Sequence, residues 1–189
     1  SPVLSPSGKY LAVTTPVNGR LNLAVVDMEA RKGAGRTSCS NYDVRNVVWV
    51  GDDRLLFSVG QANSPTGPGQ FDGGGLFVIS RDGKESRVLS KTIREQRNAR
   101  QNVRPMEFAR RIPGSTDEVI VTGNLRSADS EDVYRLNLNT GKTKLISEDR
   151  PEHAGNWILD ANLVPRVVTS WVRNTQTYVV HYRKSADAP

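Results

Sequence analysis

The sequence contains a single cysteine, Cys39, among 189 residues. One cysteine cannot form an internal disulfide, and it excludes zinc sites built from several cysteines. There is also no run of about 18 consecutive apolar residues, so a membrane partner is not expected, and no signal peptide is recognisable. The chain begins with Ser1 and Pro2 rather than with methionine, so we expect a fragment, and its compartment, periplasmic or cytoplasmic, stays open.

Residues suited to hydrolytic or metal chemistry are scarce. The pentapeptide Gly-x-Ser-x-Gly, which presents the nucleophile of many serine hydrolases, does not occur. The two histidines, His153 in a polar loop and His181 in a strand pattern, have no evident serine and aspartate partners in the sequence. Asp129, Glu131 and Asp132 lack the glycine and the terminal glutamate of a calcium loop. We therefore expect no catalytic triad, no metal site and no cofactor.

The positive charge is concentrated in one segment. The formal net charge is +6, and the segment from Lys91 to Arg111 alone holds seven positive and two negative side chains. The hydrophobic content of 37% is sufficient for a core. The sequence therefore predicts a nearly neutral domain that carries one basic insertion.

One pattern recurs four times: a turn, a short apolar strand, a variable loop and a second strand that often ends in a hairpin turn. The residues that open the strand after the turn, at spacings of 44, 64 and 47, are Tyr10, Arg54, Glu118 and Pro165. A period of about 40–50 residues is typical of β-propeller blades, and the longest spacing reaches it if about 20 residues are an insertion. The β-branched and aromatic residues between the turns favour strands over helices.

The predicted fold class is all-β, a partial β-propeller of about four blades of antiparallel four-stranded sheets. We expect a single domain over 1–189, an insertion at 91–105, and approximate blades at 1–44, 45–90, 106–150 and 151–185. The segment 58–75 is rich in glycine and proline and is predicted to be a long mobile loop. The three tryptophans are predicted to pack in the core or between blades, and they are Trp49, Trp157 and Trp171.

The insertion is expected to form a short helix or an ordered loop that ends before a proline. It contains four arginines that are candidates for a substrate-binding or domain-docking site, Arg94, Arg97, Arg100 and Arg104. In a helix, Arg94, Arg97 and Arg104 would share one face, with Arg100 at its side. Such a cluster could bind carboxylates, or it could be a solvated surface with intramolecular salt bridges. Nucleic acid is disfavoured, because Phe108 is the sole aromatic residue nearby.

Five segments carry a resemblance to known propellers, and they are Leu4–Ala12, Leu23–Asp27, Trp49–Phe57, Gly75–Gly83 and Asp132–Gly141. Their order and combination resemble the propeller of the prolyl oligopeptidase family of serine peptidases. In that family a larger propeller covers an α/β-hydrolase domain with a Ser-Asp-His triad, and it restricts and positions peptide substrates. The present sequence departs from the family by its smaller number of blades, by the lack of a hydrolase domain, and by the lack of an adjacent glutamate pair like that of dipeptidyl peptidases.

The resemblance implies a non-catalytic propeller portion that gates or positions peptide substrates for a covalently linked α/β-hydrolase domain. The alternative is a TolB-like propeller that serves as a protein–protein interaction module, because such propellers share the Ser-Pro-Ser-Gly-Lys turn found at Ser5–Lys9. A lactonase-type propeller would need central metal ligands that the sequence does not show. Open sheet edges would also permit self-association.

Overall fold

The computed structural model of the chain describes residues 2–61, 73–185 and 188. In these residues the elements are β1 (Val3–Leu4), β2 (Tyr10–Val17), β3 (Arg20–Asp27), β4 (Lys32–Arg36), β5 (Asp43–Val50), β6 (Arg54–Gly60), β7 (Gly74–Ser80), β8 (Ser86–Ser90), α1 (Ile93–Asn98), β9 (Met106–Arg111), β10 (Glu118–Ser127), β11 (Ser130–Asn137), β12 (Thr143–Leu145), β13 (Ala154–Leu159), β14 (Pro165–Val172) and β15 (Thr177–Tyr182). No helix within the described ranges is long and apolar enough to cross a membrane.

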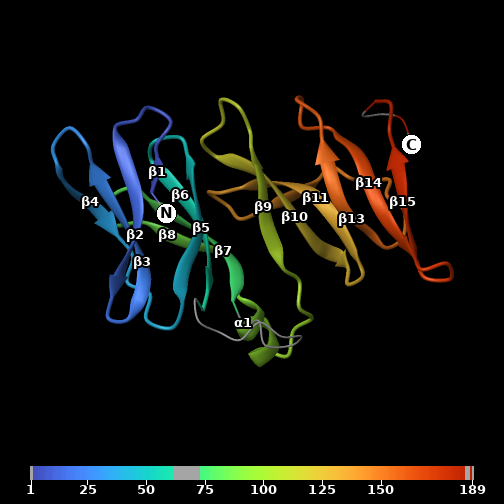
Figure 1. Cartoon of the computed structure of the whole chain (residues 1–189), viewed down its shortest axis with the longest axis horizontal. Helices are drawn as coiled ribbons and strands as arrows, with labels where there is room; N and C mark the ends of the chain where they lie inside the picture. Colours follow the sequence, from blue (N-terminus) through green and yellow to red (C-terminus); the bar gives the residue numbers. More distant parts are fainter. Residues whose placement is uncertain (1, 62–72, 186–187, 189) are drawn as a thin grey trace. The chain divides into compact units, whose positions relative to one another are not determined.

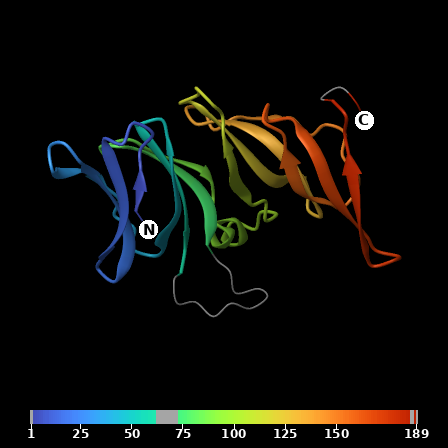
Figure 2. The ribbon, with the colours of Figure 1, turned by 45° about the horizontal axis from the view of Figure 1, so that its top comes forward.

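The strands form four antiparallel sheets, which Figure 1 shows as successive groups of arrows along the colour gradient. Sheet I contains β1–β4, sheet II β5–β8, sheet III β9–β12 and sheet IV β13–β15. Each sheet is a meander, because neighbouring strands in the sheet are also neighbours in the chain. The predicted fold class, about four propeller blades of antiparallel strands, is confirmed. Sheet IV has three strands within the described residues, whereas the other sheets have four (Figure 2).

The chain divides into two compact units. The N-terminal unit consists of Ser1–Val103 and Ser115–Asp117 and contains sheets I and II and α1. The C-terminal unit consists of Arg104–Gly114 and Glu118–Pro189 and contains sheets III and IV. Each unit has a hydrophobic core of its own between its two sheets.

The predicted repeat is present in the strands. The second strand of every sheet begins at a residue that the sequence pattern identified, and these residues are Tyr10, Arg54, Glu118 and Pro165. The turns before two of these strands contain Gly8 and Gly114, both with a φ of +75°. Glycine adopts this left-handed conformation without steric cost, so it can reverse the chain immediately before a strand.

Side chains alternate between the two faces of each strand, and this alternation decides which sheet a residue contacts. In the N-terminal unit, Ala12 and Leu23 of sheet I share a buried cluster with Leu55 and Phe57 of sheet II. In sheets I and III, we call the face that contacts the other sheet of the same unit the front face. In sheets II and IV, we call the face that makes this contact the back face, and in every sheet the opposite face takes the other name. The core of the N-terminal unit is thus the front face of sheet I against the back face of sheet II.

The C-terminal unit repeats this arrangement. Ile120 and Val133, on the front face of sheet III, share a cluster with Leu159 of sheet IV, and Trp157 packs against the same cluster. Ile158, between these two residues of β13, points the other way and is 58% exposed. The core of this unit is therefore the front face of sheet III against the back face of sheet IV.

Two of the three tryptophans link one sheet to the preceding one. The indole nitrogen of Trp49 donates to the carbonyl oxygen of Val3 at 2.9 Å. The indole nitrogen of Trp157 donates to the carbonyl oxygen of Glu131 at 2.8 Å. Because a buried indole N–H needs a partner, each bond fixes the contact between two successive sheets. The predicted packing role of these two residues is confirmed.

Three strands and one loop differ from the expectation. The sequence pattern missed β1, β4 and β9. The predicted loop 58–75 is too long at both ends, since β6 continues to Gly60 and β7 begins at Gly74. Residues 62–72 of that loop lie outside the described residues.

Candidate binding site

The Thr37 hydroxyl fixes the position of the segment that follows β4, the fourth strand of sheet I. The Thr37 hydroxyl donates to Oδ1 of Asn22 at 2.9 Å and accepts the backbone N–H of Leu23, also at 2.9 Å. Asn22 and Thr37 are both buried. The hydroxyl therefore continues the hydrogen bonding of β3 beyond the end of β4.

Sheet III has the same hydrogen-bonding arrangement, with an aspartate in the place of the asparagine. The Ser147 hydroxyl donates to Oδ1 of Asp132 and accepts the N–H of Val133, each at 2.9 Å. The two residues are fifteen positions apart, as are Asn22 and Thr37. The equivalent places in the two sheets thus hold an amide in one and a fully buried carboxylate in the other.

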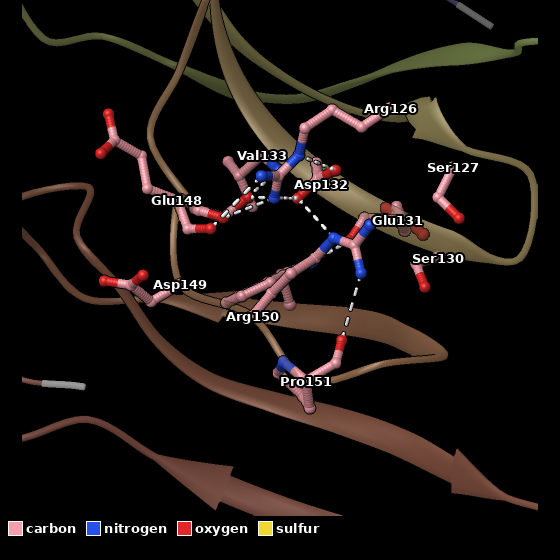
Figure 3. A network of polar contacts seen from close by, with 12 residues as sticks. Arg126, Ser127, Ser130, Glu131, Asp132, Val133, Glu148, Asp149, Arg150 and Pro151 are labelled. Carbon is pink, nitrogen blue, oxygen red and sulfur yellow. Dashed lines mark hydrogen bonds and ion pairs between the residues drawn. The ribbon is translucent and has the colours of Figure 1, made fainter.

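Two arginines neutralise the buried carboxylate of Asp132, and Figure 3 shows them reaching it from separate segments of the chain. Arg126 binds it in a bidentate manner, with Nη2 2.6 Å from Oδ1 and Nε 2.9 Å from Oδ2. Nε of Arg150 lies 2.9 Å from Oδ1. Paired, hydrogen-bonded geometry of this kind is what a buried charge needs to be tolerated.

The network shifts the pKa values of its members. Burial alone would raise the pKa of Asp132, but the hydrogen bonds from Arg126 and Ser147 and the charge of Arg150 outweigh it, so the pKa lies below the ordinary value. The pKa of Tyr134 is raised by burial and by the nearby negative charge of Asp132. Asp132 is therefore a carboxylate at neutral pH, and its role is to hold the two arginines.

The arginines in turn hold the segment 147–151. Arg126 donates to the carbonyl oxygens of Ser147 and Glu148 at 3.0 and 3.3 Å. Nη1 of Arg150 donates to the carbonyl oxygen of Pro151 at 3.2 Å. These bonds fix a segment without regular secondary structure, and this segment forms one wall of a cavity.

The cavity has a volume of about 480 Å³, within the range of small-molecule and peptide side-chain pockets. It lies between the segment 149–151 and strands β13 to β15, and its lining residues are Asp149, Arg150, Pro151, Trp157, Pro165, Arg166, Val168, His181, Tyr182 and Arg183. Three arginines stand against one aspartate, so the lining is basic. Trp157, Val168 and the ring of Tyr182 give it an apolar part.

The arginines of this cavity are positioned by neighbouring groups. Nη2 of Arg166 donates to the Tyr182 hydroxyl at 3.1 Å, and its guanidinium carbon lies 5.6 Å from the centre of that ring. Its Nη1 lies 3.9 Å from a carboxylate oxygen of Asp160. Nη2 of Arg183 donates to the carbonyl oxygen of Asp149 at 2.7 Å. Because a guanidinium has five N–H donors in a rigid fork, these contacts orient each group and leave donors for an anionic ligand.

His181 also lines the cavity, with a partner that the sequence did not indicate. Its Nε2 lies 2.8 Å from the buried hydroxyl of Ser170 on the neighbouring strand. The other histidine, His153, places Nδ1 3.1 Å from a carboxylate oxygen of Asp129. A hydrolytic triad needs one histidine between a serine and an acid. Here each histidine has one of these partners, and the two pairs lie on different segments.

The remaining polar motifs have structural roles. Asp129 also lies 3.9 Å from Arg173, and Asp132 is paired with two arginines. No group of potential metal ligands is present in the described part of the chain. Asp52, in the turn before β6, accepts the N–H of Ser7 in the turn before β2 at 3.1 Å. Gly141, with a φ of +73°, lies in a hairpin turn and not in a phosphate-binding loop.

The predicted helical face of arginines is wrong for Arg104, because α1 ends at Asn98. The N–H of Arg100 donates to the carbonyl oxygen of Arg97, Gln101 donates to Gln96, and Arg100 has a φ of +53°. This pattern is a Schellman motif, and it terminates the helix. The side chains of Arg94, Arg97 and Arg100 are exposed, whereas Arg104 is half-buried and follows the helix.

The start of α1 carries a signal that the sequence analysis missed. Thr92 and Glu95 form a capping box: the Glu95 N–H donates to the Thr92 hydroxyl at 3.2 Å, and the Thr92 N–H donates to the Glu95 carboxylate at 2.8 Å. The spacing Thr-x-x-Glu is visible in the sequence and predicts a helix start at this place.

No family model matches the sequence, and no curated protein matches it. Among solved structures, the chain is similar to TolB from Acinetobacter baumannii, with 14% identity and a TM-score of 0.49 over the whole chain and 41% of that protein. It is also similar to the tricorn protease, with 12% identity and a TM-score of 0.42 over 98% of this chain and 21% of that one. The AtxE2 isopeptidase has 13% identity and a TM-score of 0.35 over 97% of this chain and 40% of that one. The chain thus spans less than half the length of each of these proteins.

Proposed function

We propose that the chain is a non-catalytic propeller portion of a prolyl oligopeptidase-like serine peptidase, and that it positions peptide substrates for an α/β-hydrolase domain. The sequence resemblance motivates the peptidase assignment. The observation that carries the positioning role is the basic and aromatic cavity beside sheet IV, with three arginines, Trp157 and Tyr182 in its lining.

The chemistry of the cavity selects the ligand class. Arg166 and Arg183 offer guanidinium groups suited to a carboxylate, and Trp157 and Val168 offer an apolar surface beside them. A peptide with a free C-terminal carboxylate and an apolar last side chain matches both parts. Bidentate binding of the carboxylate would orient the peptide, which is the role expected of a substrate-positioning domain.

Isothermal titration calorimetry tests this proposal with two acetylated peptides that end in leucine, one with a free carboxylate and one amidated. We expect the carboxylate peptide to bind and the amide to bind at least about tenfold more weakly, because a hydrogen bond to a charged group contributes about 1.5–3 kcal/mol. Arg166→Gln with Arg183→Gln should remove this preference. The matched control is Arg135→Gln, which changes a half-exposed arginine of β11 that pairs with Glu118 at 3.5 Å. Equal binding of the two peptides by the unmodified chain would refute the proposal.

The arginines of the insertion are a second part of the proposal. We assign Arg94, Arg97, Arg100 and Arg104 to contacts with acidic groups of a substrate or of a linked domain, and the exposure of the first three supports this. Replacing Arg94 and Arg97 by glutamine should weaken binding of peptides with acidic side chains and leave binding of neutral peptides unchanged. Unchanged affinity for both kinds of peptide removes the substrate-contact part of the assignment.

A further inference from the structure

We propose that the front face of sheet IV binds the back face of sheet I of a second copy of this chain. This self-association goes beyond the proposed function, and the register places one residue of the cavity lining, Tyr182, at the edge of the same face. The contact would have the same form as the two sheet-on-sheet contacts inside the units.

The front face of sheet IV is apolar and exposed. By strand register it contains Ile158, Val167, Thr169, Trp171, Tyr178, Val180 and Tyr182. Tyr178 and Val180 are each 67% exposed, and Ile158 is 58% exposed. The rings of Trp171 and Tyr178 lie 4.9 Å apart, so this part of the face is already ordered by its own contacts. Contiguous exposed apolar surface of this kind marks an interaction site.

The repeat shows what covers this face elsewhere in the chain. Val180 lies opposite Thr169, the fourth residue after the start of β14. At the same register position, Leu23 lies opposite Thr14 in sheet I, and Val133 lies opposite Thr122 in sheet III.

These equivalent apolar residues differ in exposure. Leu23 is 1% exposed and Val133 is 0% exposed, because the back face of the following sheet packs on each. Val180 is 67% exposed. The register of sheet IV therefore presents the side chains that elsewhere receive the back face of another sheet.

Sheet I supplies a back face of the required kind. By register it contains Leu4, Leu11, Val13, Ala24 and Val26. Leu4 is 56% exposed. In sheet II the residues that correspond to Leu11 and Val13 are Leu55 and Phe57, which are 0% and 6% exposed because sheet I covers them.

The chain thus carries both halves of one interface on two different sheets, which defines a heterologous contact between copies.

Sedimentation velocity of the purified chain over a range of concentrations tests the proposal. We expect self-association that is reversed by dilution. Val180→Lys on the front face and Leu4→Lys on the back face should each raise the dissociation constant at least about tenfold, because each buries a charge in an apolar contact. Tyr178→Lys serves as a second front-face variant if Val180→Lys does not fold. The matched control is Val88→Lys on β8, a valine that is 55% exposed on neither proposed face, and it should leave the association unchanged.

Mixing the two variants separates this contact from unspecific association. The Leu4→Lys copy keeps an intact front face and the Val180→Lys copy an intact back face, so the mixture should form one contact and associate although neither variant does so alone. A wild-type chain that stays monomeric at all concentrations overturns the proposal, and this outcome would favour a further sheet of a longer chain as the partner. Association that is as strong in both face variants as in the wild-type chain also overturns it.

Discussion

Replacing Asp132 by asparagine should destabilise the C-terminal unit, because it removes the charge that holds two arginines. The carboxylate accepts from Arg126 at 2.6 and 2.9 Å, from Arg150 at 2.9 Å and from Ser147 at 2.9 Å, and it is fully buried. Removing one partner of a buried pair typically costs about 3–5 kcal/mol. Asparagine keeps one oxygen to accept from Ser147 and one arginine, so we expect the lower end, about 3 kcal/mol.

Hydrogen exchange measures this change in the right place, because the chain has two units and a global unfolding curve would mix them. Amides of β10 and β11 should exchange about a hundredfold faster in the Asp132→Asn variant, since about 1.4 kcal/mol corresponds to a factor of ten. Amides of β2 and β3 in the N-terminal unit should be unaffected.

The matched control is Glu118→Gln, which removes the partly exposed pair with Arg135 and should cost less than about 1 kcal/mol. An Asp132→Asn variant whose exchange in β11 changes no more than that of Glu118→Gln would refute the reasoning, because it would show that the buried pairs contribute no more than a surface pair.

Three further predictions concern the pH dependence of stability, the hydroxyl of Thr37 and the glycine at position 75. Because the pKa of Asp132 lies below its unfolded value of about 3.9, its stabilisation is present above that pH and is lost as the pH falls through the folded pKa, so exchange in β11 should accelerate in acid and Asp132→Asn should lack this acceleration. Thr37→Val should cost about 1–3 kcal/mol, because the buried N–H of Leu23 loses its acceptor, whereas Thr37→Ser should retain most of the stability; exchange of β3 amides distinguishes the two, and equal effects would contradict the assigned bond. Gly75→Ala should cost at least about 2 kcal/mol, measured by hydrogen exchange of the amides of the N-terminal unit, because φ is +70° and the added Cβ would lie 2.9 Å from the Ser90 carbonyl oxygen. Gly8→Ala, with a similar φ and nothing within 4 Å of the added Cβ, should cost about 1 kcal/mol, and equal costs would exclude the steric contribution.

The sequence predicted the central strands of each sheet because these strands are apolar and follow turns. The starts of β2, β6, β10 and β14 coincide with the predicted residues, since each follows a turn that glycine, proline or aspartate makes recognisable. The outer strands lack this pattern. In β4 the sequence is Lys-Gly-Ala-Gly-Arg, and Gly35 is required because a Cβ there would collide with the carbonyl oxygen of Arg81. In such a strand the residues are small because another backbone segment passes close by, so the sequence shows no alternation of apolar and polar residues.

The candidate site was less predictable than the fold. In the sequence Asp132 is recognisable only as one member of an acidic run, because its partners Arg126 and Arg150 come from segments on either side of β11. The common spacing of fifteen residues in the pairs Asn22 with Thr37 and Asp132 with Ser147 was available in the sequence, and alignment of the repeats would have found it. The cavity beside sheet IV joins residues up to 34 positions apart, such as Asp149 and Arg183, and no local pattern indicates that contact.

Native mass spectrometry of the 189-residue chain with the acetylated carboxylate peptide tests the proposed function most directly, because one spectrum shows both binding and peptide integrity. The account predicts a complex that holds one peptide per chain, with the peptide at its intact mass, and no such complex with the amidated peptide. Cleaved peptide would contradict the non-catalytic role, and the absence of a complex, or equal complexes with both peptides, would contradict the carboxylate site.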